Sequence, residues 1–180
     1  FIEKYVPFGG SGRECYYKLV DPFCLFYLRF MKEAAAIDEN YWQKNLNSQP
    51  LNVWRGFAFE NVCAHHVPQI KKALEIGGVS SKQSTWILHG DKNKKGTQVD
   101  LIIQRDDHVY NLCEIKFYND QFVVDIEYYK KILGRINTLV DASPKNVTVH
   151  STLITTFGLK KNEHSGAFVK VVTLDDLFER

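Results

Sequence analysis

Long apolar runs, patterned cysteines and an excess of one charge sign are all missing from this 180-residue sequence. The longest apolar run, residues 25–31, contains Arg29 and is far shorter than the roughly 18 residues that a membrane span needs. Lys and Arg total 23 against 21 for Asp and Glu, so the overall charge indicates neither a nucleic acid nor a membrane as partner. The N-terminus also lacks the basic flank and apolar block of a signal peptide. We therefore expect a soluble, cytoplasmic protein that does not bind membranes.

The four cysteines, Cys15, Cys24, Cys63 and Cys113, include no C-x-x-C pair. Their wide spacing excludes the patterns typical of a zinc ribbon or a disulfide framework. All four lie in segments with apolar periodicity, so we expect each of them to be buried as a small apolar side chain.

Methionine is nearly absent, because Met31 is the only one and the first residue is Phe1. This predicts that the chain begins part-way through a longer protein. With 44% hydrophobic and 24% charged residues, the chain can still bury a core of its own. Its length predicts one domain, or one domain with an attachment.

The first 50 residues have the pattern of such an attachment. Residues 2–7 and 14–20 alternate as strands around a glycine-rich turn and predict a hairpin. Asp21 and Pro22 then predict the N-cap and first position of a helix, and a second short helix is expected at about residues 37–46. The polar segment 47–50 ends in a proline, so we divide the chain into residues 1–50 and a main domain of residues 51–180.

The main domain alternates between helix and strand periodicity. A long helix is expected at about residues 52–74, with a buried stripe that begins at Val53 and Phe57 and meets a carboxylate at Glu60. A second long helix is expected at about residues 124–140, and a short one from residue 173. The expected strands are residues 83–89, 97–104, 109–117, 147–156 and 168–172. This order predicts an α/β fold in which a mixed sheet is flanked by helices.

Charged side chains occupy positions in this pattern where apolar ones are expected. Asp100 alternates with Val99 and Leu101 and shares a strand face with Ile102, and Glu114 and Lys116 continue a face that is otherwise apolar. An unpaired buried charge costs several kcal/mol, so proteins seldom keep one without a partner or an ion. These residues are therefore candidates for a functional site.

The loop between the two strands decides whether the carboxylates meet. A two-residue turn at Asp106 and Asp107 would place Cys113 opposite Asp100, whereas a three-residue loop that includes His108 places Glu114 there. Opposed residues on antiparallel strands have Cβ atoms about 4.5–5.5 Å apart. The site thus requires the three-residue loop, or a single bulge, in this hairpin.

Such a pair of carboxylates suits a hard divalent cation, Mg²⁺ or Mn²⁺. Lys116 would project from the same face and would orient or help to deprotonate a water while offsetting charge on a phosphate. Glu60, from the helix packed on the sheet, would complete the metal shell directly or through water. Together these roles predict metal-assisted hydrolysis of a phosphodiester.

The order of these residues resembles the PD-(D/E)xK nuclease superfamily. Glu60 lies on a helix, Val99-Asp100 follows on a strand, and thirteen residues separate Asp100 from Glu114-Ile115-Lys116. Val99 replaces the proline that usually precedes the aspartate. The resemblance implies a restriction-endonuclease-like fold in which Asp100, Glu114 and the backbone carbonyl of Ile115 bind Mg²⁺. It also implies that Lys116 serves the water and that DNA is the substrate.

A second resemblance covers nearly the whole chain. Residues 1–4, 19–23, 25–30, 56–60 and 112–117 resemble the C-terminal part of a family of bacterial and archaeal AAA-type ATPases. In that family a P-loop domain is followed by a winged helix and a nuclease-like domain. The resemblance implies that residues 1–50 are the wing hairpin and trailing helices of a winged-helix region. ATP would bind only in a domain upstream of Phe1, and a homo-oligomer is a further expectation.

Two alternatives remain open. Asp100, Glu114 and Lys116 would also suit a buried structural ion pair, or a nuclease fold that binds DNA or protein and regulates the ATPase without cleaving. Basic residues on a loop and on the second long helix are candidate DNA contacts, although a solvated loop and an ordinary amphipathic helix explain them equally well. These candidates are Lys92, Lys94, Lys95, Lys130 and Lys131.

Overall fold

The computed structural model describes residues 1–10, 15–32, 39–88 and 96–179. Its strands are β1 (Ile2–Tyr5), β2 (Tyr16–Leu19), β3 (Ser81–Leu88), β4 (Thr97–Arg105), β5 (Val109–Lys116), β6 (Thr148–Thr155) and β7 (Lys170–Thr173). Its α-helices are α1 (Pro22–Phe26), α2 (Tyr41–Asn45), α3 (Gln49–His65), α4 (Val67–Ala73) and α5 (Ile126–Ala142). None of the helices within these ranges is long and apolar enough to cross a membrane.

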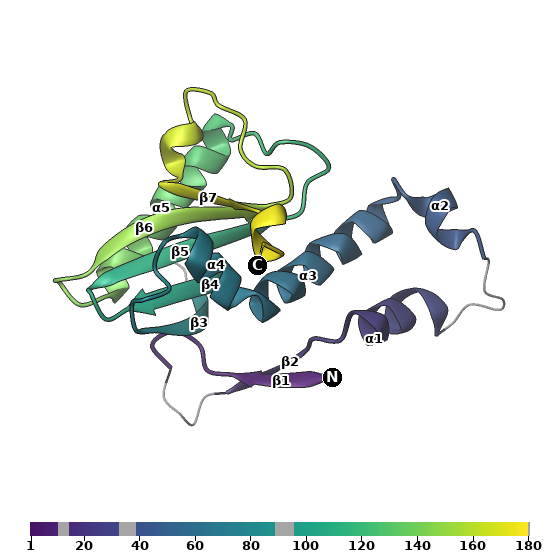
Figure 1. The fold of residues 1–180 in the computed structure, drawn as a ribbon, viewed down its shortest axis with the longest axis horizontal. Helices are drawn as coiled ribbons and strands as arrows, with labels where there is room; N and C mark the ends of the chain where they lie inside the picture. Colours follow the sequence, from purple (N-terminus) through teal and green to yellow (C-terminus); the bar gives the residue numbers. More distant parts are fainter. Residues whose placement is uncertain (11–14, 33–38, 89–95, 180) are drawn as a thin grey trace.

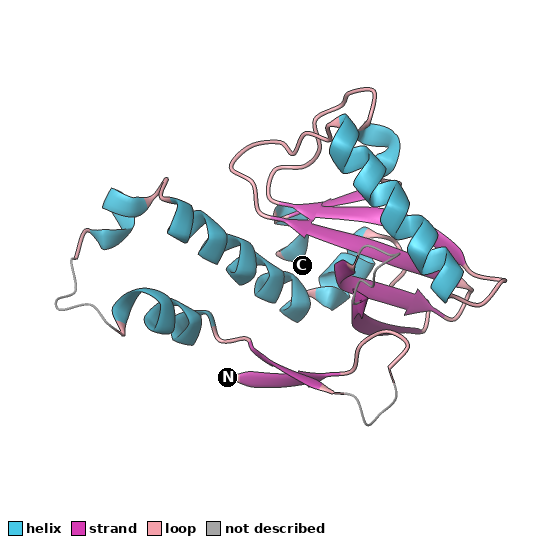
Figure 2. Ribbon diagram, turned by 180° about the vertical axis from the view of Figure 1, so that it is seen from behind, coloured by secondary structure: helices cyan, strands magenta, loops and turns pink. Residues whose placement is uncertain are grey.

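The five strands β3 to β7 form one mixed sheet in chain order. The first three are antiparallel, and β6 and β7 are added parallel to β5. Helices α3 and α4 lie on one face of this sheet, and α5 crosses the other face (Figure 1, Figure 2). The prediction of a mixed sheet flanked by helices is therefore confirmed.

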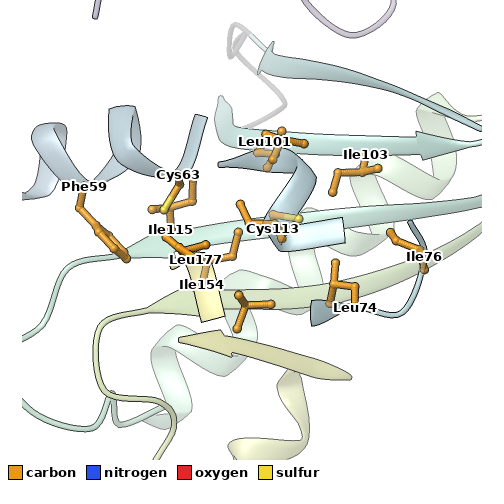
Figure 3. Packing of buried hydrophobic residues seen from close by; sticks show 13 residues of the cluster. Phe59, Cys63, Leu74, Ile76, Leu101, Ile103, Cys113, Ile115, Ile154 and Leu177 are labelled. Carbon is orange, nitrogen blue, oxygen red and sulfur yellow. The ribbon is translucent and has the colours of Figure 1, made fainter. Parts of the chain in front are cut away.

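Each face of the sheet buries its own apolar cluster. Leu101, Ile103 and Cys113 belong to one cluster with Phe59, Cys63 and other residues of α3 and α4 (Figure 3). On the opposite face, Ile102 and Leu112 pack with Leu139 of α5 and with Trp86. Both faces of β4 and β5 are buried because both are interior strands of the sheet, as the apolar faces of residues 97–104 predicted for β4.

The long helix predicted at residues 52–74 is in fact two helices. The first, α3, begins at Gln49 with Ser48 as N-cap, so the polar segment that suggested a boundary contains the start of a helix. The chain leaves helical geometry at His66 because Pro68 cannot donate a backbone hydrogen bond, and α4 begins at Val67. The predicted stripe is also wrong at its start, since Val53 and Phe57 are more than half exposed whereas Leu51 and Phe59 are buried.

The N-terminal hairpin has the predicted form, with β1 antiparallel to β2. Asp21 caps α1 by accepting a hydrogen bond from the N–H of Cys24 at 2.6 Å, and Pro22 is the first helical residue, as predicted. The helix continues as one π-helical turn, Tyr27–Met31. Cys15 and Cys24 are only half-buried in this region, so the expectation of four buried cysteines holds only for Cys63 and Cys113.

Candidate active site

The β4–β5 hairpin has the register that the carboxylate pair requires. Leu101 pairs with Cys113 and Gln104 with Tyr110, which leaves a three-residue loop at residues 106–108. His108 closes this loop in the left-handed region, with φ of 64°. The paired residues end at Leu101 and Cys113, and Asp100 and Glu114 are the next residues along the two strands.

On its other side, β4 carries an extra residue at Asp100. Ser84 pairs with Ile102 and Trp86 with Val99, so Thr85 alone faces both Asp100 and Leu101. This bulge breaks the simple alternation expected for the strand: Val99 packs with Ile102 and not on the face of Leu101. Bulges of this kind re-aim a side chain and are common beside active sites.

Glu114 is the most deeply buried charge among the described residues, with 0% of its side chain exposed. Its Oε1 is ion-paired with Nη1 of Arg135 on α5. Its Oε2 accepts a hydrogen bond of 3.1 Å from the hydroxyl of Tyr128, and Nζ of Lys116 lies 4.0 Å away. Both carboxylate oxygens are therefore engaged by groups of the protein itself.

Asp100 and Glu60 form a second acidic group near Lys116. Glu60 is ion-paired with Lys18 of the N-terminal hairpin at 3.6 Å. Burial raises the pKa of Glu60, the charge of Asp100 raises it further, and the charges of Lys18 and Lys116 lower it. Because Lys116 acts on Glu60 and also lies beside Glu114, it is the cation shared by the two acidic groups.

The field of Asp100 reaches side chains on both flanking helices. On α3, burial raises the pKa of Cys63 to about 12, with smaller contributions from Glu60 and Asp100. On α5, burial, then the charge and hydrogen bond of Glu114, raise the pKa of Tyr128, and Asp100 adds to this. Cys63 is thus an inert thiol, and the Tyr128 hydroxyl keeps its proton as a donor to Glu114.

The described residues match the oxygen donor set of a magnesium site only in part. They contain no group of three or more His, Cys, Asp or Glu side chains placed to hold a metal ion. Mg²⁺, however, is commonly bound through one or two carboxylates with water and substrate phosphate completing the shell. Asp100 is half-buried and makes no hydrogen bond or ion pair to a described residue, which leaves its carboxylate available.

The other predicted ligands lie around this pair. Ile115 is in register with Ile154 of β6, and its side chain lies in the core beneath α3 (Figure 3). Glu60 would have to leave Lys18 to bind an ion directly. Glu114 would likewise have to leave Arg135, so each of these two carboxylates is engaged by a basic group of the protein.

The predicted DNA contacts divide into two groups. Lys92, Lys94 and Lys95 lie outside the described residues. Lys130 and Lys131 are exposed on α5 beside a pocket of about 970 Å³, and Nζ of Lys131 lies 5.6 Å from the centre of the Tyr128 ring. The structure thus brings the two helical lysines to the side of the sheet where Glu114 points.

The sequence did not identify Arg135 and Tyr128 as the partners of Glu114. They are seven residues apart, so they lie on one face of α5, and Ile132 and Leu139 on the same helix are buried. The available signal was that these polar residues lie beside the buried face of the helix that follows the strand of Glu114. Lys18 was also missed, since nothing in the sequence indicated that the hairpin would reach Glu60.

Comparisons with known proteins give little beyond this geometry. No family model matches the sequence, and no curated protein matches it. The chain is similar to a crystal structure of a protein of unknown function, AF1548, with 16% identity and a TM-score of 0.44. That match covers 64% of this chain and 64% of the other.

Proposed function

We propose that this protein is a metal-dependent hydrolase of DNA phosphodiester bonds, with a PD-(D/E)xK nuclease-like fold. The observation that carries the proposal is the fully buried carboxylate of Glu114 on an interior strand, 4.0 Å from Lys116 and next to the strand that carries Asp100. Burying a charge on a central strand is costly unless it is paired. A functional role is one reason for a protein to keep such a charge.

In this proposal each side chain has a separate task. Asp100 and Glu114, with the carbonyl of Ile115, would hold Mg²⁺ or Mn²⁺, which would neutralise charge on the phosphate. Lys116 has a side chain that is 35% exposed, so its ammonium can reach both solvent and Glu114. It would orient the attacking water and stabilise charge that develops on the phosphate. Glu60 would assist through water while it is ion-paired with Lys18.

A non-cleaving module is the second candidate, and a specific observation favours it. Both oxygens of Glu114 are already engaged by Arg135, Tyr128 and Lys116, which is the arrangement of a satisfied structural carboxylate. In that case the fold would bind DNA or protein without cutting. Lys130 and Lys131 would then contact the phosphate backbone of DNA, which requires positive charge and gives little sequence specificity.

Cleavage of supercoiled plasmid DNA in Mg²⁺ or Mn²⁺ separates the two candidates. We expect nicking by the wild-type protein and a loss of about a hundredfold or more in Asp100→Ala and Lys116→Ala, since each removes a group that acts in the transition state. Lys82→Ala and Asp106→Ala remove exposed charges of the same types from β3 and from the hairpin loop, and should cleave like the wild type.

Two results would contradict the proposal. Cleavage that survives Asp100→Ala and Lys116→Ala would show that the assigned residues are not the site. No cleavage in either metal, together with retained DNA binding in a gel-shift assay, would favour the non-cleaving module. The assay is best made on the complete parent protein with and without ATP, because we also propose an ATPase domain upstream of Phe1 as a partner in the same chain.

A further inference from the structure

Arg135 contacts the carboxylate that the proposed function assigns to a divalent cation. Its Nη1 is paired with Oε1 of Glu114, and the side chain of Arg135 is only 14% exposed. A guanidinium held at this depth is an ordered group and not a mobile surface side chain. The position beside Oε1 of Glu114 is thus filled by a cation that belongs to the protein.

The other described partners of Glu114 are weaker than Arg135. Lys116 lies 4.0 Å from Oε2, at the limit of an ion pair, and Tyr128 contributes a hydroxyl without charge. A buried carboxylate that loses its partner is strongly destabilising. The charge of Glu114 is therefore compensated mainly by Arg135, and a divalent cation would supply the same compensation.

We propose that Arg135 is the resident counter-ion of Glu114 and that a divalent cation must displace it to bind. This inference rests on the proposed function, because it concerns the same metal site. Arg135 thereby sets the affinity for the metal: it compensates the charge of Glu114 in the absence of metal, and it weakens metal binding by competing for Oε1. It is a positioning residue, since it acts through Glu114.

The structure also provides room for the displaced guanidinium. Arg135 and Tyr128 line the pocket of about 970 Å³ beside α5. Three acidic side chains line the described part of the same pocket: Asp125, Glu127 and Asp141. These carboxylates offer the guanidinium other partners near the surface, which lowers the cost of leaving Glu114.

Isothermal titration of the full chain with Mn²⁺ at a fixed pH tests this competition. Arg135→Gln removes the competing charge, so we expect Mn²⁺ to bind roughly ten- to a hundredfold more tightly than to the wild type, the range for loss of one charge-assisted hydrogen bond. Arg135→Lys keeps a cation but loses the guanidinium geometry, and should lie between the two. Glu114→Gln should abolish binding.

The control is Asn137→Ala, an exposed position on the same helix, which should bind Mn²⁺ like the wild type. A role for Arg135 in structure alone predicts the opposite sign, because a disordered site binds the ion less well. Weaker or unchanged binding in Arg135→Gln, with an unchanged circular dichroism spectrum, would overturn the inference and leave the metal site standing. No binding to any of the proteins would remove the proposed metal site as well.

A measurement on the wild type decides the matter if Arg135→Gln does not fold. The Nη–H resonance of Arg135 in a ¹H–¹⁵N spectrum reports the contact of Nη1 with Glu114, and the resonance is assigned by its absence from Arg135→Lys. Addition of Mg²⁺ should shift this signal in a saturable way and leave the backbone signal of Asn137 in place. A resonance that does not move while Mg²⁺ binds would overturn the inference.

Discussion

Glu60 shows how a single carboxylate connects the site with the stability of the fold. Its charge pairs with Lys18 of the hairpin and is also affected by Asp100 and Lys116. Burial and the like charge of Asp100 outweigh the two lysines, so the pKa of Glu60 is raised above its ordinary 4.5. The folded protein therefore holds this carboxylate at a cost.

That cost predicts that Glu60→Gln raises the stability of the folded protein, by an amount that depends on pH. The folded state binds the proton of Glu60 more tightly than the unfolded chain, so the carboxylate lowers stability as the pH rises through the interval between the two pKa values. Below that interval both states are protonated and the cost vanishes. Urea unfolding should show Glu60→Gln to be more stable than the wild type at neutral pH and equal to it at about pH 3.

Glu179→Gln provides the control, because Glu179 is exposed near the C-terminus. Its midpoint should follow the wild type at both pH values. A Glu60→Gln protein that is less stable at neutral pH would show that the ion pair with Lys18 outweighs burial, contrary to the direction of the pKa shift.

At the scale of elements, α5 presents two of the groups that contact Glu114, and its N-terminus fixes where they lie. Asp125 caps this helix by accepting a hydrogen bond of 2.7 Å from the N–H of Tyr128. Asp125→Ala should lower the free energy of unfolding by about 1 kcal/mol, and Asp125→Ser should retain most of it. Urea unfolding measures both variants.

The same helix supplies a matched control at its other end. Asp141 lies in the last turn of α5, where a negative charge opposes the helix dipole. Asp141→Ala should therefore leave stability unchanged or raise it slightly. An equal loss in Asp125→Ala and Asp141→Ala would show that the cap does not contribute and that helix surface charge alone is being measured.

The elements could be predicted where local chemistry decides them. The Asp21 cap and the strands of the sheet follow from residue type and alternation, whereas the sequence left open whether the loop before β5 has two residues or three. The break at His66 was also present in the sequence, as Pro68, but the apolar periodicity on both sides concealed it. The bulge at Asp100 was not readable, because it depends on how β3 pairs across the sheet.

The candidate site, too, could be predicted only where local sequence decides it. Its strand residues were identified because charges interrupt an apolar pattern, and their register follows from the loop. The partners of Glu114 could not be identified from the sequence. Arg135 and Tyr128 are ordinary residues for an amphipathic helix until the packing of α5 on the sheet is known. Long-range packing, and not local propensity, decides which cation faces a buried carboxylate.

In the whole molecule, the N-terminal hairpin packs on the sheet domain at several points. The N–H of Phe8 donates a hydrogen bond of 2.7 Å to the carbonyl of Thr85, and Pro7 forms a parallel bridge with the same residue. The Phe8 ring meets the edges of Trp86 and Tyr110, with centroids 5.8 and 5.9 Å away. These contacts join residues 1–50 to residues 51–180, so the predicted division of the chain has to be tested by whether the two parts unfold separately.

Phe8→Ala tests whether they unfold together. If the hairpin and the sheet form one cooperative unit, loss of this half-buried ring should lower the free energy of unfolding by about 1–3 kcal/mol. The midpoints measured by tryptophan fluorescence and by far-ultraviolet circular dichroism should then fall together. Phe23→Ala, at a position on α1 that is 67% exposed, should change stability by less than about 0.5 kcal/mol. If the hairpin is instead an independent attachment, Phe8→Ala will speed amide hydrogen exchange in β1 and β2 while the exchange of β4 and β5 stays unchanged. That second pattern would also separate Lys18 from the site, because its contact with Glu60 would then open without unfolding the sheet.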